Sequence, residues 1–255
     1  MSHTSNFQPV LSIITIVYNN VTDIERTIRS IVAQDYPHIE YIVVDGASTD
    51  GTLEIIYNYQ KHIAKVLSEK DEGIYDAMNK GLRLADGDYI LFMNSGDELY
   101  APNTVSSVFQ TASDADIYYG ETEMIDEKGV SLGRRRHKAP EKFTWKSFKY
   151  GMSISHQAIY IKKTICGFYD TRYQLSADID WILTAAKKAD HIVNTHRYVA
   201  KYLVGGMSKK RHFKSLKERF HILTKHYGLM SNLLNHLVIT FNLACYYSKH
   251  GKTND

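Results

Sequence analysis

The sequence predicts an α/β fold in which a mixed, mainly parallel sheet is flanked by helices and followed by a helical C-terminal tail. Two apolar runs rich in β-branched residues, 11–18 (LSIITIVY) and 41–45 (YIVVD), are typical of strands buried on both faces of a sheet. Between them, Ile24, Ile28 and Ile31 recur at helical spacing. Strand, helix and strand in this order favour a parallel sheet.

The first hundred residues repeat this strand and helix unit about three times and end at an acidic loop, NSGDE. We expect Thr22 or Asp23 to cap the first helix, and the turn cluster GASTDG to lead into the second. The predicted strands are 11–18, 41–45, 66–67 and 88–93, and the predicted helices are 24–32, 53–57 and 75–84.

Beyond Pro102 the pattern changes to short strand-like pieces, which favour a mixed rather than a parallel arrangement. We therefore expect a main domain at 1–208, divided into halves at 10–100 and 101–208, and a basic amphipathic helical tail at 209–255. The later predicted elements are helices at 104–111, 177–188 and from 213, and strands or extended chain at 117–125, 130–136, 155–162 and 192–204.

The composition is that of an ordinary globular protein, with 44% hydrophobic and 23% charged residues in a chain of 255. The polar N-terminus lacks the apolar run of a secretory signal, and no segment has the ~20 apolar residues that span a bilayer. Cys166 and Cys245 have neither metal-type nor redox-type spacing. We therefore expect an intracellular protein without a disulfide framework.

The net charge of +3 is unevenly distributed, because residues 201–255 hold ten Lys or Arg against Glu218 and Asp255. Such a basic tail favours an anionic partner, and a lipid surface fits better than nucleic acid because no nucleic-acid motif accompanies it. A solvated helical face is the alternative.

Acidic groups follow three consecutive predicted strands. Asp45 closes the second strand, residues 69–72 (EKDE) follow the third, and residues 94–97 (NSGD) follow the fourth. One carboxylate at such a place is usually a helix cap. Ligands of open α/β sheets bind beyond the carboxyl ends of the strands, so three in succession favour a polar ligand or a metal.

The same residues resemble glycosyltransferase family 2, with its GT-A, Rossmann-like fold, and in particular the bacterial O-antigen and colanic-acid enzymes. The resemblance covers roughly residues 10–210 in order, and this order makes it specific. The matching strings are SIITIVYNN at 12–20, IVVDGASTDGT at 42–52, EKDEGIYDAMNKGLRLADGDYILFMNSGD at 69–97, SHQAIYIKK at 155–163 and SADIDW at 176–181.

The resemblance implies that the first half binds a nucleotide-sugar donor, with UDP favoured. Thr15 and Tyr18 would lie near the base, and Asp45 would accept hydrogen bonds from base or ribose, as a carboxylate does in fixed geometry. Asp71 would make a further nucleotide contact. An ordinary strand role for Thr15 and helix capping by Asp71 are the alternatives.

The NSGD loop stands where this family carries its DXD-type metal motif, which implies Mg²⁺ or Mn²⁺ bound at Asp97, with Asn94 and Ser95 against the donor. Such a cation needs only one or two carboxylates when it bridges diphosphate oxygens. Asn94 and Gly96 replace acidic residues of the commoner motif, so we expect weak affinity for free metal. A tight turn capped by Asp97 is the alternative.

The SADIDW segment corresponds to the family's E-D-x-D motif, which implies that Asp178 is the catalytic base. Ala177 stands where the family has Glu, and Asp180 is the reserve candidate for the base. Capping of the helix is the alternative role of Asp178.

The acceptor side is implied by the HQ pair His156 and Gln157, together with Trp181, although a lone histidine is more often structural. Ser208 of the GGMS segment would contact phosphate from a mobile loop.

The resemblance thus implies an inverting transfer of sugar to a hydroxyl of a glycan or lipid-linked acceptor in bacterial surface polysaccharide synthesis. The tail would then hold a cytoplasmic enzyme peripherally on the inner face of the membrane. The apolar face of the tail is explained as well by packing on the main domain, or on a second subunit as in a homodimer. A sugar-nucleotide pyrophosphorylase would need a Gly-rich basic loop where TIVYNN stands. An inactive sugar-nucleotide-binding module remains the other alternative, since Asn94, Gly96 and Ala177 depart from the family pattern.

Overall fold

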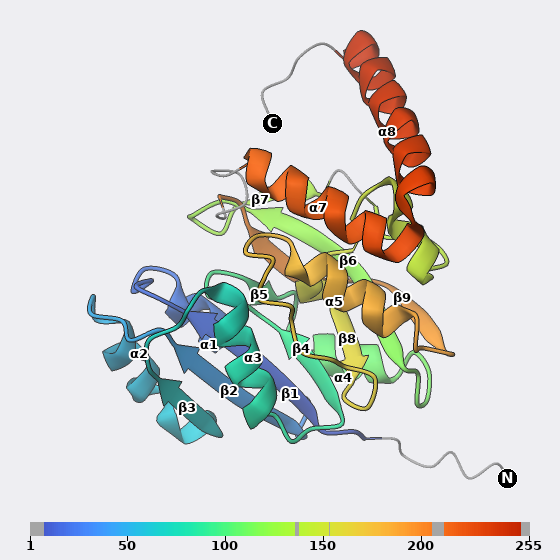
Figure 1. Cartoon of the computed structure of the whole chain (residues 1–255). Coiled ribbons are helices and arrows are strands. Elements are labelled where there is room, and N and C mark those ends of the chain that lie inside the picture. The colour runs from blue at the N-terminus through green and yellow to red at the C-terminus, as the bar shows by residue number, and fades with distance from the viewer. Residues whose placement is uncertain (1–7, 136–137, 153, 206–211, 251–255) are drawn as a thin grey trace, which may run out of the picture.

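A computed structural model describes residues 8–135, 138–152, 154–205 and 212–250, with the side chains of 212 and 241–250 left out. Its strands form one curled, mixed sheet with helices on both faces (Figure 1). The strand order is β3-β2-β1-β4-β8-β6-β9-β5, and β7 pairs with β6 at the side of this path.

The first half of the sheet is parallel, as predicted. It contains β1 (Leu11–Val17), β2 (Ile39–Asp45), β3 (Lys65–Ser68) and β4 (Tyr89–Phe92), with β1 between β2 and β4. All seven residues of β1 are buried, because helices cover both faces of this strand. The parallel register brings the carboxyl ends of β1, β2 and β3 to one edge.

The helices of this half are α1 (Ile24–Val32), α2 (Thr52–Asn58) and α3 (Ile74–Leu84), with the 3₁₀ turn η1 (Gln60–His62) after α2. Alternate residues of β1 face opposite cores: Ile13 packs with α1 and α2, and Ile14 packs with α3. The predicted cap of α1 is confirmed in position but not in its side-chain bonding. Asp23 occupies the N-cap position of α1 but makes no capping hydrogen bond with its side chain.

The second half is mixed, also as predicted. Strand β8 is antiparallel to both β4 and β6, β9 runs parallel to β6, and the short β5 is antiparallel to β9. The elements are β5 (Glu98–Leu99), α4 (Thr104–Phe109), β6 (Ile117–Ile125), β7 (Ser131–Arg134), η2 (Trp145–Tyr150), η3 (His156–Ala158), β8 (Ile159–Lys162), α5 (Ala177–Ala186) and β9 (Ile192–Leu203).

One predicted strand starts too early. Residues 156–158 form the 3₁₀ turn η3 after the N-cap residue Ser155. A hydrogen bond from the Ala158 N–H to the Ser155 carbonyl (3.0 Å) closes the turn, and β8 begins only at Ile159. The turn aims the side chains of His156 and Gln157 at the loop after β4 rather than into a ladder.

The tail consists of α7 (His212–Tyr227) and α8 (Leu229–His250), which are joined at Gly228. The expected boundary at 208 does not separate two packing units, because Ile222 and Leu223 of α7 join the main core. The Glu218 carboxylate also accepts hydrogen bonds from the backbone N–H groups of Gln174 (3.1 Å) and Leu175 (2.8 Å). Helix α8 is the part that projects from the body (Figure 1).

Within the described ranges, no helix combines the length and the apolar character that crossing a membrane requires.

Candidate active site

Two loops at the edge of the parallel half are bound to each other. The Asn19 N–H donates to Ser48 Oγ (2.8 Å), and the Thr49 N–H donates to Asn19 Oδ1 (2.9 Å). Asn19 and Ala47 both have left-handed backbones, with φ of 46° and 63°. Non-glycine residues in that region store strain, which is common at ligand sites.

Asp45 lies between these loops, and one of its carboxylate oxygens makes no hydrogen bond within the described part of the chain. It is fully buried, and its Oδ2 accepts hydrogen bonds from the Ser48 N–H (3.0 Å) and the Ser68 hydroxyl (2.6 Å). Its Oδ1 is buried without a hydrogen-bond partner among the described residues. A buried oxygen without a partner is costly, so this acceptor is suited to a ligand donor.

Gly46 brings Tyr18 and Asp71 to the same place. A Cβ added at Gly46 would lie 2.8 Å from Asp71 Oδ2 and 3.2 Å from Tyr18 Cδ2, so a larger residue would push these side chains apart. The Tyr18 side chain is 66% exposed, whereas Asp71 pairs with Lys80 (2.8 Å). Burial raises the pKa of Asp71, and Lys80 opposes that shift. Three of the four predicted nucleotide contacts therefore lie together.

The fourth, Thr15, does not reach this edge. It is fully buried, and its hydroxyl donates to the Met93 carbonyl (2.8 Å) and accepts from the Tyr41 hydroxyl (3.2 Å). The structure thus favours the alternative of an ordinary strand residue that links β1 to its neighbours.

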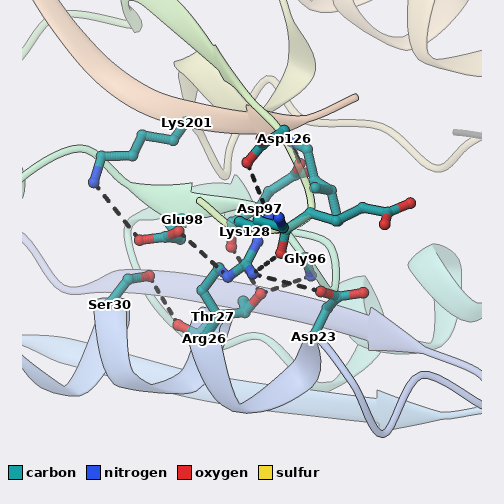
Figure 2. Close-up of polar contacts among 12 residues, drawn as sticks. Asp23, Arg26, Thr27, Ser30, Gly96, Asp97, Glu98, Asp126, Lys128 and Lys201 are labelled. Carbon is teal, nitrogen blue, oxygen red and sulfur yellow. Dashed lines mark hydrogen bonds and ion pairs between the residues drawn. The ribbon is translucent and has the colours of Figure 1, made fainter. Parts of the chain in front are cut away.

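The NSGD loop is fixed to α1 by Thr27 (Figure 2). The Thr27 hydroxyl donates to the Asp97 carbonyl (2.7 Å) and accepts from the Gly96 N–H (2.8 Å). Gly96 has a φ of 102°, and a Cβ there would lie 2.8 Å from Leu203 Cδ2. The backbone conformation favours glycine at this position, which accounts for one departure from the family motif.

Ser95 faces the loop after β1. Its hydroxyl accepts a hydrogen bond from Asn20 Nδ2 (2.9 Å), and its N–H donates to the Ile16 carbonyl (3.3 Å). The loop after β4 is thereby joined to the donor-side loops.

Asp97 is almost entirely buried. Its Oδ2 accepts from Gln157 Nε2 (2.6 Å), and its Oδ1 accepts from the Leu203 N–H (3.0 Å). Burial raises the pKa of Asp97 to about 6, against the effect of these two hydrogen bonds. Gln157, predicted to contact the acceptor, is itself buried and orients Asp97 instead.

The fit of a cation at this loop follows from its oxygen donors. No cluster of three or more His, Cys, Asp or Glu side chains suited to a metal occurs in the described part of the chain. Each Asp97 oxygen retains a second lone pair, and Asn94 Oδ1 in the same turn is buried without a partner among the described residues. Asp97 is thus a single carboxylate held by two N–H donors, so a hard cation bound there would take its other ligands from diphosphate and water.

Asp178 lies in the first turn of α5, where the helix dipole favours a negative charge. Its Oδ1 accepts a hydrogen bond from the Tyr75 hydroxyl (3.2 Å), and its Oδ2 lies 3.7 Å from His156 Nδ1. Burial alone would raise the pKa of Asp178. The contact with His156 and the charge of Arg219 outweigh burial and hold this pKa below its usual value, so the carboxylate is ionised at neutral pH.

His156 joins this carboxylate to the NSGD loop, because its Nε2 lies 2.9 Å from Asn94 Nδ2. The side chains of His156 and Asp178 are 15% and 18% exposed, so both can be reached from outside. Three motifs that are far apart in the sequence thus meet in one place.

Asp180 and Trp181 point away from it. Asp180 forms ion pairs with Lys225 (2.9 Å) and His226 (2.7 Å), which tie α5 to α7. Trp181 is buried, donates to the Gly167 carbonyl (2.7 Å) and stacks on Tyr169 with 4.9 Å between ring centroids. The expected acceptor role of Trp181 is therefore replaced by a core role, and the position of Asp180 does not support it as the base.

Sequence reasoning missed Thr27, Tyr75 and Arg135. Tyr75 stands inside the matched string at 69–97, so its polar hydroxyl on an apolar helix face was an available signal. Arg135 donates to Ser155 Oγ (2.8 Å), next to His156. Thr27 shares the buried face of α1 with isoleucines and gives no separate signal. Ser208 lies outside the described residues.

A separate open hollow of about 480 Å³ lies along the outer side of α1. Its charges largely cancel, because Arg29 pairs with Glu25 (2.8 Å) and Arg26 with Glu98 (3.7 Å, Figure 2). We assign it no role.

The arrangement to compare with known proteins is a mixed sheet with the Asp178 carboxylate in one half and, beyond the parallel strands of the other, buried oxygens of Asp45 and Asn94 that are unpaired among the described residues. The family model for glycosyl transferase family 2 matches residues 12–169, and the chain belongs to this family.

Two relatives illustrate the match. An uncharacterized glycosyltransferase of Mycobacterium tuberculosis is 32% identical over 187 residues, which cover 70% of this chain and 69% of the relative. The PGL/p-HBAD biosynthesis glycosyltransferase of Mycobacterium bovis is 28% identical over 228 residues, covering 85% and 86%.

Solved structures share the fold at low identity. Residues 1–349 of Staphylococcus aureus TarS in complex with UDP match with a TM-score of 0.66 and 18% identity, over 94% of this chain and 72% of that one. The mannosyltransferase PcManGT of Pyrobaculum calidifontis, in complex with GDP-Man and Mn²⁺, matches with a TM-score of 0.65 and 17% identity, over 97% and 77%.

Proposed function

We propose that this protein is an inverting glycosyltransferase that moves a sugar from a nucleoside-diphosphate sugar to an acceptor hydroxyl. The observation that carries the proposal is the convergence of Asn94, His156 and Asp178, from three separate motifs, on the side of the sheet where Asp45 leaves an acceptor open. UDP is the favoured nucleotide, and GDP is the alternative to be screened.

The donor would lie across the ends of the parallel strands. Tyr18 offers an exposed ring for the base, and the open Oδ1 of Asp45 suits a uracil N–H or a ribose hydroxyl. Asp71, Asn94 and Ser95 complete the polar lining toward the diphosphate.

Asp97 is the residue proposed to hold Mg²⁺ or Mn²⁺. When bound, such a cation supplies charge neutralisation for the leaving diphosphate. Gln157 and the Leu203 N–H keep the Asp97 carboxylate in one orientation, so it needs no reorganisation when the donor arrives.

Asp178 is the proposed base. It takes the proton of the acceptor hydroxyl as that oxygen forms a bond to the anomeric carbon. The bond from this carbon to the diphosphate oxygen breaks at the same time, and its electron pair leaves with the nucleotide. Attack opposite the departing group inverts the anomeric centre.

The central test is calorimetry of UDP and GDP binding to the full chain, first with EDTA and then with Mn²⁺. We expect binding to require the cation, and a UDP-sugar to be hydrolysed slowly when no acceptor is present. Equal affinity in both conditions would remove Asp97 from its metal role. An inactive binding module would bind nucleotide and release none from a UDP-sugar.

We also propose that the acceptor is lipid-linked, in bacterial surface polysaccharide synthesis, and that α8 lies on an anionic membrane. Two asparagines of α8 face the protein: Asn232 is fully buried and donates to Thr224 Oγ1 (2.9 Å), and Asn235 is 9% exposed. The described apolar side chains of α8 face outward. No Asp or Glu occurs between Glu218 and Asp255, so no carboxylate in this segment would repel an anionic surface. The outward set is Leu229, Met230, Leu233, Leu234, Leu237 and Val238.

Liposome sedimentation tests this proposal. Anionic vesicles should bring down the full chain in low salt and release it in high salt, because electrostatic attraction is screened over ~8 Å at physiological ionic strength. Leu234→Asp with Leu237→Asp should abolish sedimentation, whereas Val130→Asp, at an exposed apolar residue on the body, should not. A salt-independent dimer that ignores vesicles would assign α8 to a second subunit.

A further inference from the structure

Four polar side chains lie in a line through the proposed base, with hydrogen-bond distances at both ends and a longer contact between His156 and Asp178. Asn94 Nδ2 lies 2.9 Å from His156 Nε2, and His156 Nδ1 lies 3.7 Å from Asp178 Oδ2. The Tyr75 hydroxyl holds the other oxygen of the same carboxylate, Oδ1, at 3.2 Å. The four residues come from the loop after β4, from η3, from α5 and from α3.

The polarity of this line is set at its Asn94 end. In the orientation that the structure gives the Asn94 amide, Nδ2 faces His156 and can only donate, so the His156 nitrogen opposite it accepts. An imidazole nitrogen accepts only when it carries no proton, and a neutral ring then carries its proton on the other nitrogen. That nitrogen is Nδ1, which faces Asp178.

The contact between Nδ1 and the carboxylate is longer than a hydrogen bond. Catalytic hydrogen bonds are often long before substrate binds and shorten in the reacting complex. Tyr75 fixes one carboxylate oxygen, so a small rotation of the imidazole brings the Nδ1 proton onto the other without moving α5.

We propose that His156 is a positioning residue for Asp178, and that Asn94 selects its Nδ1–H tautomer. The Nδ1 proton, with the Tyr75 hydroxyl, holds the carboxylate in one rotamer, with its remaining lone pairs available to the acceptor hydroxyl. The inference rests on the proposed role of Asp178 as base. It also gives Asn94 a purpose, since an Asp at this position would accept rather than donate and would require a proton on Nε2.

The direct test is the tautomer of His156 in the ¹⁵N-labelled full chain at neutral pH. Two-bond ¹⁵N–¹H correlation spectra distinguish protonated from unprotonated imidazole nitrogens, and comparison with His156→Gln assigns the signal. We expect a protonated Nδ1 and an unprotonated Nε2. An Nε2–H ring, or a ring protonated on both nitrogens, would overturn the proposal. This readout needs no glycosyl transfer.

A matched pair of variants tests the consequence for turnover. The amide nitrogen of His156→Asn lies near the position of Nδ1, whereas that of His156→Gln lies near Nε2. Removing an orienting partner typically lowers activity by roughly 10–100-fold, so we expect that loss in kcat of UDP-sugar hydrolysis for Gln and only about 3-fold for Asn. UDP affinity should stay unchanged in both.

These experiments distinguish failure of the positioning role of His156 from failure of the proposed glycosyltransferase function. Equal losses of kcat in both variants would overturn the positioning role. The expected tautomer in a protein that hydrolyses no nucleotide sugar would sink the proposed function and leave the geometry of His156 intact.

Discussion

The two halves of the sheet supply their functional groups in different ways. In the parallel half, Asp45 and Asn94 stand where strands end, and neighbouring loops hold them. In the mixed half, His156 belongs to a 3₁₀ turn and Asp178 to the first turn of a helix, and long-range strand pairing brings them together. From this difference we infer that the first half of the sheet binds the donor and that the second half provides the catalytic base. Two substitutions test this division directly, and two at residues outside the proposed site sharpen it.

The largest effect is expected from Asp178→Asn. General-base assistance is worth ~10²–10⁴ in rate, so transfer or donor hydrolysis should fall by that factor while UDP affinity stays within a few fold. Steady-state kinetics and calorimetry on the same preparation measure both. Near-normal turnover in this variant, with turnover lost in Asp180→Asn, would move the base by two residues.

A substitution on the donor side should give the reverse pattern. Asp45→Asn converts an acceptor into a donor at a buried charge-assisted contact, which costs about 1.5–3 kcal/mol, or roughly 10–100-fold in UDP affinity. Turnover at saturating donor should change little. Ser68→Ala is the control, because it removes only a partner of Asp45 Oδ2. Unchanged UDP affinity in Asp45→Asn would contradict the division between halves.

Asp180→Asn should affect stability rather than function. It leaves Lys225 and His226 without their carboxylate, which we expect to cost about 2–3 kcal/mol of unfolding free energy. Burial opposes ionisation, but His226 and Lys225 hold the pKa of Asp180 below its usual 3.8. The stabilisation is therefore complete above the unfolded-state pKa and is lost as pH falls through the folded-state value.

Urea unfolding at several pH values checks this expectation. The difference between wild type and Asp180→Asn should be constant near neutrality and shrink below about pH 4. A pH-independent difference would mean that packing, not the ion pair, is what the variant loses.

The smallest effect is expected from Thr15→Val, which keeps the shape of the side chain and removes one buried hydroxyl. Its loss should cost about 1 kcal/mol of stability, because Tyr41 loses its acceptor, and should leave UDP affinity unchanged. A marked loss of UDP affinity would restore Thr15 to the donor site.

The parallel half could be predicted from the sequence because its strands are buried on both faces, and local composition alone identifies them. Asp45 and Asn94 followed from their places at strand ends. The mixed half resisted prediction where partners come from afar. The apolar run of β8 was recognised, but only its pairing with β4 and β6 decides that it starts at Ile159. The resemblance implies an acceptor contact for Trp181, and nothing nearby in the sequence indicates Tyr169 as the stacking partner that gives this side chain a core role instead.

The hydrogen bond from the Leu203 N–H to Asp97 spans 106 positions of sequence and also dictates when the site can form. Strand β5 completes its pairing only against Ala200 and Lys201 of β9. A chain emerging from the ribosome can therefore build the parallel half early, and Thr27 can already hold the backbone of the loop that carries Asp97. The Asp97 carboxylate, however, gains its Leu203 partner only when β9 has been made and has closed this long loop. Donor hydrolysis should consequently appear only in fragments that extend past residue 203, which assays of C-terminally truncated chains would measure.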